Sequence, residues 1–310
     1  MNQTPAKRGS LFIEVVKDSM QSTLMGRVAD LLEMIKFSHT IFALPFALTG
    51  LILASGGLPS PYVLAWVIVA MVGARTCAMA FNRIADTEID AKNPRTAERH
   101  LPSGRIASRD AWVMTIAGAL LMVFAAWMLN PLCLMLSPLA LIVLFLYPYT
   151  KRFTALCHYV LGLALAAAPL GAWIAVTGEF SLKPLPLALA VLLWVAGFDV
   201  FYALQDLDFD SEEGLHSIPA KLGVKGALKL AAKLHIAMFL LLVSQLFIFN
   251  LGLWYIAGMA LVGYLLFYEH ALVTPNDLSR LDAAFFNMNG IISVVVFVAT
   301  LTDVTLGGGW

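Results

Sequence analysis

The sequence predicts an all-α membrane protein with nine transmembrane helices. Hydrophobic residues make up 60% of the 310 residues and charged residues only 13%, whereas soluble domains carry about 25% charged residues. A helix needs roughly 20 apolar residues to cross a bilayer core, and nine stretches of about this kind follow one another along the chain. Lys and Arg also gather on one side of these stretches, as is typical of polytopic membrane proteins.

Hydropathy and turn-forming residues place the nine spans in order. Gly, Pro and Asn separate several of them, as in SGGLPSP after the first and LNP after the third. We expect one transmembrane domain over residues 34–302, preceded by a segment, 1–33, that is either an interfacial helix or a partly ordered tail, and followed by a short tail, 303–310. The expected spans are 34–56, 62–85, 110–129, 132–149, 155–177, 184–205, 226–249, 253–272 and 285–302.

The distribution of positive charge predicts the orientation. If the N-terminus is cytoplasmic, 18 of the 20 Lys and Arg residues fall in cytoplasmic segments or toward the cytoplasmic ends of the spans, Lys183 falls in an outer segment and Arg75 lies deeper within a span. Positive residues favour the cytoplasmic side. We therefore expect an integral protein of a bacterial inner membrane, with a cytoplasmic N-terminus and its charged segments together on the cytoplasmic side.

A weak internal repeat indicates two four-helix units followed by a ninth helix. Pro45 and Pro169 are 124 residues apart, and the same offset of 124 relates Asn82 to Asp206 and Asp86 to Asp210. Such a repeat would place the two acidic clusters opposite each other.

The first acidic cluster is NRIADTEID, where the second span ends. Asn82, Asp86 and Asp90 are four residues apart, so a helix would align them in one polar stripe. Ionisable groups at membrane depth are costly and are usually functional. Mg²⁺ takes one or two carboxylates and fills its remaining positions with water and phosphate oxygens. The pattern therefore predicts a cation among these side chains, with Asp86 as the first candidate for a Mg²⁺ ligand.

The second cluster, QDLDFD, ends the sixth span. Asp206 and Asp210 are again four residues apart, and we expect them to bind a second Mg²⁺. Asp208 points elsewhere on a regular helix but can act as a base if the helix is broken there. Two facing metal sites would neutralise a diphosphate between them and assist its departure.

Basic residues near both clusters are candidates for binding the diphosphate. Arg binds phosphate oxygens through a planar fork and Lys as a point charge. Cytoplasmic loops of membrane proteins are rich in Lys and Arg in any case, which explains many of these residues without a binding role. We therefore favour Lys151, which lies at a helix end beside two tyrosines and not in the middle of a loop. The candidates are Lys151, Arg152, Arg95, Arg99 and Lys36.

The combined pattern resembles the UbiA superfamily of intramembrane aromatic prenyltransferases over about residues 34–302. NxxxDxxxD at residue 82 and DxxxD at residue 206 are similar to its two metal-binding motifs. NPRTAERHLPSGRI, YPYTKR and the segment after the second motif are similar to its conserved loops.

The resemblance implies the metal ligands and the reaction. Asn82, Asp86 and Asp90 would bind one Mg²⁺, and Asp206 and Asp210 would bind the other. Mg²⁺ promotes ionisation of a polyprenyl diphosphate, an electron-rich aromatic ring attacks the carbocation, and a base removes the ring proton. Asp206 or Asp208 is the implied base. The implied acceptor is a hydroxylated aromatic acid, either 4-hydroxybenzoate for ubiquinone or 1,4-dihydroxy-6-naphthoate for menaquinone. The protein would also contact membrane lipid, and we expect no nucleic-acid partner.

Two other classes compete with this interpretation. An ion-coupled transporter places its ion-binding carboxylates near the membrane midplane, whereas both clusters here end their helices beside Arg-rich segments. A phospholipid-headgroup transferase also uses Asp and Mg²⁺, but its Asp-Gly and Ala-Arg signature is missing from the sequence.

Overall fold

The apolar stretches form a bundle of long helices in the computed structural model, which describes residues 26, 30–34, 43–281 and 287–307. Eight helices are long and apolar enough to cross a membrane, and a shorter apolar helix, α2 (Leu44–Ser55), precedes them. The predicted all-α membrane architecture is confirmed, with the count of nine as an approximation. The eight long helices are α3 (Pro61–Ala85), α5 (Ser108–Leu129), α6 (Pro131–Thr150), α7 (Cys157–Thr177), α8 (Leu185–Ala203), α10 (Ile218–Ile248), α11 (Leu253–Leu272) and α12 (Asn289–Leu306).

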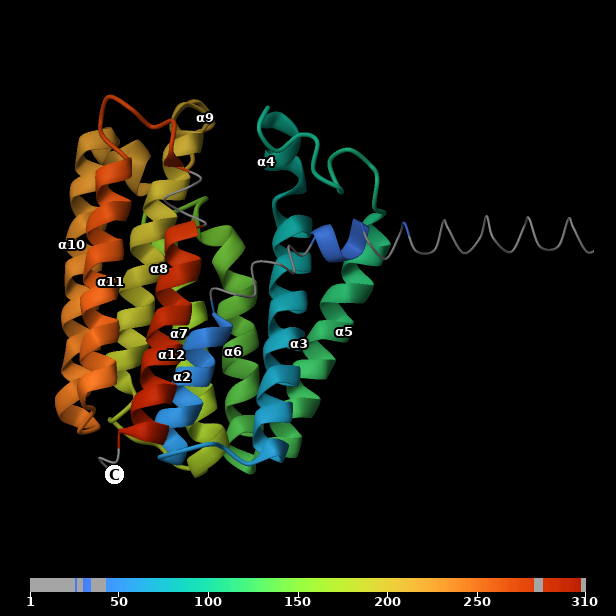
Figure 1. The fold of residues 1–310 in the computed structure, drawn as a ribbon. Coiled ribbons are helices and arrows are strands. Elements are labelled where there is room, and N and C mark those ends of the chain that lie inside the picture. Colours follow the sequence, from blue (N-terminus) through green and yellow to red (C-terminus); the bar gives the residue numbers. More distant parts are fainter. Residues whose placement is uncertain (1–25, 27–29, 35–42, 282–286, 308–310) are drawn as a thin grey trace, which may run out of the picture.

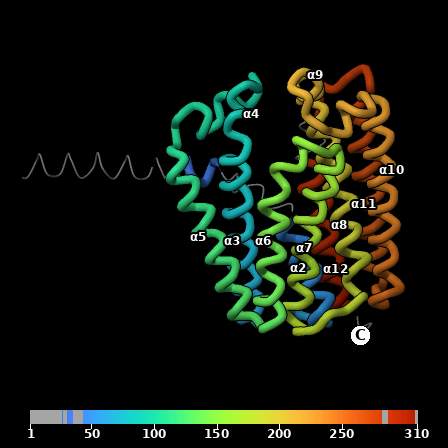
Figure 2. The backbone as a smooth tube through the Cα atoms, turned by 180° about the vertical axis from the view of Figure 1, so that it is seen from behind, coloured from blue at the N-terminus to red at the C-terminus, as the bar shows by residue number. Residues whose placement is uncertain are grey.

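Two short helices, α4 (Thr87–Lys92) and α9 (Leu207–Glu212), lie at the same end of the bundle in both views (Figure 1, Figure 2). The last turn of α12 lies at the opposite end of the bundle. We call the end that carries α4, α9 and the segments 93–107, 150–156 and 213–217 the charged end.

Helix α8 forms the centre of the bundle, because it is the most deeply buried of the eight spans. Trp194 and Phe198 pack edge to face, with ring centroids 4.9 Å apart, and Phe46 of α2 lies at the same distance from Trp194. These rings join α2 to α8 within the largest apolar cluster, which also contains Ile292 and Val296 of α12. The core therefore fixes the position of the helix that leads into the second acidic cluster.

Small residues allow close helix crossings, as is common in membrane bundles. A Cβ at Gly73 of α3 would stand 2.6 Å from the backbone nitrogen of Met122, and one at Gly118 of α5 would stand 2.6 Å from that of Cys77. Helices α3 and α5 thus touch backbone to backbone. This contact holds the helix that ends in the first acidic cluster.

Several span ends differ from the sequence expectation. The first span, expected over 34–56, is described only from α2 at Leu44, because residues 35–42 lie outside the described part of the chain. Helix α10 begins at Ile218, but its backbone leaves helical geometry at Gly223 (φ 65°, ψ 174°), so the continuous helix after this break starts close to the expected residue 226. Helix α12 continues to Leu306, although we expected a tail from residue 303. The carboxylate of Asp303 accepts a hydrogen bond from the Gly252 amide at 2.7 Å, so this charge caps the start of α11 instead of ending α12.

The close crossing of α3 and α5 predicts a specific sensitivity. Gly118→Ala should lower the free energy of unfolding by about 1–3 kcal/mol, the usual cost of overpacking, because the new methyl group meets backbone atoms. Gly171→Ala is the matched control, since its Cβ would have no neighbour within 4 Å. Unfolding in mixed micelles measures both changes, and equal stability of the two variants would contradict the close contact.

Candidate active site at the charged end

Both acidic clusters lie where a long helix is interrupted. The backbone leaves helical geometry at Asp86, with φ −98° and ψ 5°, between α3 and α4. It does so again at Asp206, with φ −106° and ψ 10°, after a 3-10 turn over Leu204–Asp206. The expected continuous stripe of Asn82, Asp86 and Asp90 is therefore wrong in detail, because the helix is interrupted at its middle member. The hydrogen bonds from the Asp86 amide to the Asn82 carbonyl and from the Asp90 amide to the Asp86 carbonyl persist, so the three residues stay close along the chain.

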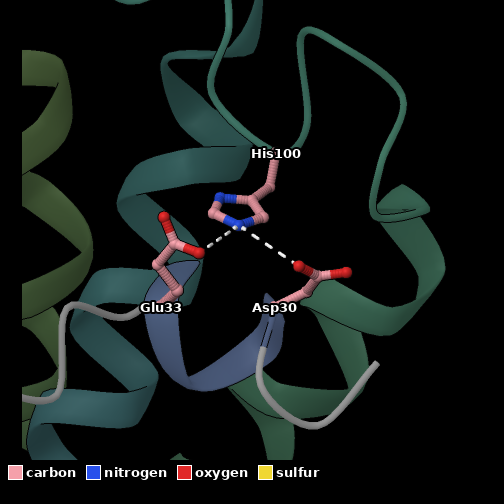
Figure 3. A group of neighbouring side chains, drawn as sticks. All are labelled: Asp30, Glu33 and His100. Atoms are coloured by element: carbon pink, nitrogen blue, oxygen red, sulfur yellow. Dashed lines mark ion pairs between the residues drawn. The ribbon is translucent and has the colours of Figure 1, made fainter. Parts of the chain in front are cut away.

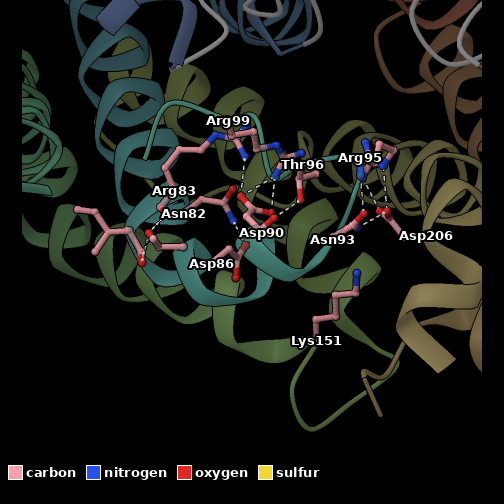
Figure 4. A network of polar contacts seen from close by, with 12 residues as sticks. Asn82, Arg83, Asp86, Asp90, Asn93, Arg95, Thr96, Arg99, Lys151 and Asp206 are labelled. Atoms are coloured by element: carbon pink, nitrogen blue, oxygen red, sulfur yellow. Dashed lines mark hydrogen bonds and ion pairs between the residues drawn. The ribbon is translucent and has the colours of Figure 1, made fainter. Parts of the chain in front are cut away.

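In the first cluster, the two carboxylates are stabilised by the side-chain amide of Asn82 and by nearby arginines. The Asn82 amide donates to Asp86 Oδ2 at 2.9 Å (Figure 4). Arg99 Nη1 donates to both oxygens of buried Asp90, at 2.7 and 2.8 Å, and Arg83 Nη1 lies 3.8 Å from Asp90 Oδ2. Charge-assisted hydrogen bonds of this kind offset the cost of burying a carboxylate.

The loop after the first cluster reaches the second cluster. Arg95 donates to both oxygens of Asp206, with Nε 2.9 Å from Oδ1, and the Asn93 amide donates to Oδ1 at 2.8 Å. Arg95 also donates to the Tyr202 hydroxyl at 2.9 Å, and Figure 4 shows Arg95 and Asn93 converging on Asp206. Lys92 and Glu213, 2.7 Å apart, add a more exposed link between the ends of α4 and α9. The two clusters therefore belong to one connected polar site.

The end of α6 contributes two cations between the clusters. Lys151 Nζ lies 2.7 Å from Asp210 Oδ1, and Arg152 Nη2 lies 3.7 Å from Asp86 Oδ1. The Lys151 side chain extends toward the region between Asp86 and Asp206 (Figure 4). The His216 amide donates to the Lys151 carbonyl at 2.8 Å, which ties this helix end to the segment after α9.

Asp210 supplies the observation that tests whether a metal ion fits. It is fully buried, Lys151 Nζ lies 2.7 Å from its Oδ1, and neither carboxylate oxygen accepts a hydrogen bond from the described residues. A buried carboxylate with unsatisfied oxygens is costly unless a cation contacts it. Asp86 offers a second carboxylate, which Arg152 approaches only at 3.7 Å. Carboxylate oxygens are the donors that Mg²⁺ prefers, so the residues present fit a hard divalent cation.

The electrostatic environment of Asp86 is consistent with a cation-binding position beside its carboxylate. Burial raises the pKa of Asp86 from 3.8 to about 6, and the nearby Asp90 adds to the increase, while Arg152, Lys151 and Arg83 oppose it. The carboxylate thus carries its negative charge at a cost in the absence of a metal. A bound divalent cation would remove that cost.

The structure brings most predicted site residues together, but not all of them. Asp208 is exposed on α9, whereas Asp206 and Asp210 on either side of it are buried. Lys36 lies outside the described residues. Sequence reasoning assigned no role to Asn93, Tyr202 or Arg83. Asn93 begins the NPRT segment directly after α4, and its place after the acidic stripe was the available signal.

Comparison with known protein families matches residues 43–291 to the UbiA prenyltransferase family. The chain is 32% identical over 260 residues to a 4-hydroxybenzoate octaprenyltransferase of Nitrosomonas eutropha, covering 83% of this chain and 89% of that protein. A protein of the same name from Vibrio atlanticus is 30% identical over 84% of this chain and 92% of its own length.

Solved structures show the same fold. The apo structure of a UbiA homolog from Aeropyrum pernix K1 has a TM-score of 0.79 and 36% identity, and the match covers 86% of this chain and 98% of that one. A UbiA homolog from Archaeoglobus fulgidus bound to DMAPP and Mg²⁺ has a TM-score of 0.67 and 19% identity, with 89% and 99% of the two chains covered. Together with the polar site between α4, α6 and α9, these matches show that this integral membrane protein belongs to the UbiA prenyltransferase family.

Proposed function

We propose that the protein transfers a polyprenyl group from polyprenyl diphosphate to a hydroxylated aromatic acid of the 4-hydroxybenzoate type, with Mg²⁺, in quinone biosynthesis. The observation that carries the proposal is the meeting of both acidic clusters with Lys151 and Arg152 at one end of the bundle. The relatives named 4-hydroxybenzoate octaprenyltransferase support the acceptor class. The neighbour solved with DMAPP and Mg²⁺ supports a metal-bound diphosphate.

The carboxylates divide between two proposed ion positions. Asn82, Asp86 and Asp90 would hold one Mg²⁺, and Asp206 and Asp210 would hold the other. Bound Mg²⁺ would neutralise the diphosphate and make it a better leaving group. The alternative acceptor that the sequence left open, 1,4-dihydroxy-6-naphthoate, would use the same metal and diphosphate ligands. An assay must therefore decide which of the two acids is the acceptor.

The cations that now neutralise carboxylates would bind the substrate. Arg95 and Arg99 each span two oxygens of one carboxylate, and Lys151 contacts Asp210. The planar fork that fits a carboxylate also fits a diphosphate. We expect Lys151, Arg152, Arg95 and Arg99 to contact diphosphate oxygens when the carboxylates hold metal, and Lys36 remains a candidate from the sequence.

The reaction then balances with groups of the site. The bond between the prenyl carbon and the diphosphate oxygen breaks, and the diphosphate keeps the electron pair. A ring carbon of the acceptor forms the new carbon–carbon bond, and its proton passes to a carboxylate, for which Asp206 and Asp208 are the candidates. Asp206 lies among the polar groups of the site, but Arg95 and Asn93 occupy both of its oxygens, which weakens it as a base.

The proposed location follows from charge. The charged end carries the basic segments, and the side that is rich in Lys and Arg is normally cytoplasmic. We therefore place the active site and the N-terminus on the cytoplasmic side of a bacterial inner membrane, where a water-soluble aromatic acid and a lipid-embedded prenyl chain can both arrive.

Removing the carboxylates should abolish turnover without unfolding the protein. Asp86→Ala and Asp210→Ala should each lower kcat/KM by at least about 100-fold, because each removes charge that stabilises the departing diphosphate. Glu88→Gln is the matched control, since Glu88 lies on α4 but is exposed. Prenyl transfer by purified, folded variants measures the effect, and wild-type activity in either alanine variant would disprove the metal assignment.

Lys151 should act on diphosphate binding. Lys151→Ala should raise the KM for polyprenyl diphosphate by about 10- to 100-fold, the effect expected for losing one hydrogen bond to a charged group. Lys225→Ala, which removes an exposed lysine of α10, should leave KM unchanged. Equal KM values for the two variants would exclude Lys151 from the diphosphate site.

The two candidate bases can be separated by one variant. Asp208→Asn preserves size and exposure but removes the ability to accept a proton. If the base is Asp206, the Asp208→Asn variant keeps nearly the full turnover rate. A turnover rate lowered by about 100-fold or more, with normal KM for both substrates, would assign proton removal to Asp208.

A further inference from the structure

A second group of polar side chains includes a residue of the loop that carries the site arginines, His100, which follows Arg99 in the sequence. Asp30 and Glu33 lie on one helical turn, and His100 faces them from the 93–107 loop (Figure 3). One ligand atom of each residue lies within 4.8 Å of the others. None of the three has a role in the proposed transfer reaction.

The imidazole has no hydrogen-bond partner at the nitrogen that faces the acids. His100 is 7% exposed, and its Nε2 is buried without a partner among the described residues. This atom lies 3.6 Å from Glu33 Oε2 and 4.0 Å from Asp30 Oδ1, which is too far for a hydrogen bond to either. Figure 3 shows the nitrogen pointing between the two carboxylates. A buried polar atom in this situation needs a partner that is not a protein group.

The geometry of the group favours a bound cation over an ion pair with a protonated histidine. A protonated ring would donate a hydrogen bond to a carboxylate, whereas Nε2 lies 3.6 Å from Glu33 Oε2 and 4.0 Å from Asp30 Oδ1. A neutral imidazole can offer the Nε2 lone pair, and the two carboxylates bring two negative charges. Neutral imidazole with carboxylates is a donor set suited to zinc-class ions.

The distances suit such an ion after a small adjustment. Zinc bonds to nitrogen and oxygen are about 2.0–2.2 Å, which places two tetrahedral ligands about 3.3–3.6 Å apart. The observed 3.6 and 4.0 Å are close to this separation. The side chains of Asp30 and Glu33 are 40% and 70% exposed, so they can move inward and leave an entry path from water.

We propose that Asp30, Glu33 and His100 form a binding site for a divalent transition-metal ion of the zinc class, with water completing the coordination. The site would join the helical turn at residues 30–34 to the 93–107 loop, which supplies Arg95 and Arg99. It is separate from the proposed Mg²⁺ positions and does not depend on the transfer reaction.

Zinc titration of the full-length protein tests the proposal directly. Isothermal titration with Zn²⁺ should be done in excess Mg²⁺, so that Mg²⁺ occupies the acidic clusters, and without diphosphate, because diphosphate itself chelates Zn²⁺. We expect one Zn²⁺ per chain in the wild-type protein. Loss of a group outside the ligand shell costs roughly 10- to 100-fold in metal affinity, so His100→Ala should weaken binding by more than about 100-fold.

Controls separate coordination from general effects. Glu33→Gln and Asp30→Asn should also weaken Zn²⁺ binding, while Glu98→Gln, an exposed carboxylate in the same loop, should not. X-ray absorption of the zinc-loaded protein should show a histidine nitrogen that is absent in the His100→Ala variant. Equal affinity of wild type and His100→Ala, a spectrum without histidine, or no stoichiometric binding would overturn the proposal.

Discussion

The arrangement of this protein depends on neutralising negative charge at one end of a membrane bundle. Asp90, Asp206 and Asp210 are buried, and a buried carboxylate is tolerated only with an opposite charge or a metal. Arg99 neutralises Asp90 and Arg95 neutralises Asp206, whereas the oxygens of Asp210 accept no hydrogen bond from the described residues. The clusters are therefore compensated by cations that a diphosphate could also use. This exchange of partners links the stability of the site to the binding of its substrate.

The helices explain why these charges can meet. Close crossing at Gly73 and Gly118 fixes α3, and aromatic packing around Trp194 fixes α8. Each helix is then interrupted at an aspartate, so α4 and α9 can turn toward α6 and its terminal Lys151. The spans also bury polar side chains such as His235, Glu269 and Asn289, but the two acidic clusters lie where their spans end. A membrane enzyme that joins a lipid-soluble donor to a water-soluble acceptor needs such a boundary site.

Hydropathy predicted the helices well but could not predict the pairing of their charges. The expected span 253–272 coincides with α11, and that from 62 to 85 differs from α3 by one residue at its start. A break at Gly223 separates the first turn of α10 from the long helix that hydropathy predicted, and the expected ninth span stopped at 302, before Asp303, whose carboxylate caps a neighbouring helix. The contact of Arg95 with Asp206 joins residues far apart in the sequence, so local patterns cannot predict it. The interruption at Asp86 breaks a locally favourable helical pattern, so it too depends on tertiary structure.

The central claim is metal-dependent prenyl transfer to a hydroxylated aromatic acid at this site. The most direct measurement is transfer by the purified protein in lipid vesicles, with a long-chain polyprenyl diphosphate and either 4-hydroxybenzoate or 1,4-dihydroxy-6-naphthoate, in Mg²⁺ or in excess EDTA. The account predicts prenylated 4-hydroxybenzoate with Mg²⁺, none in EDTA, and recovery when Mg²⁺ is restored. Product from the naphthoate alone would reassign the acceptor and keep the metal site. Full activity in EDTA, or no product from either acid with Mg²⁺, would contradict the account.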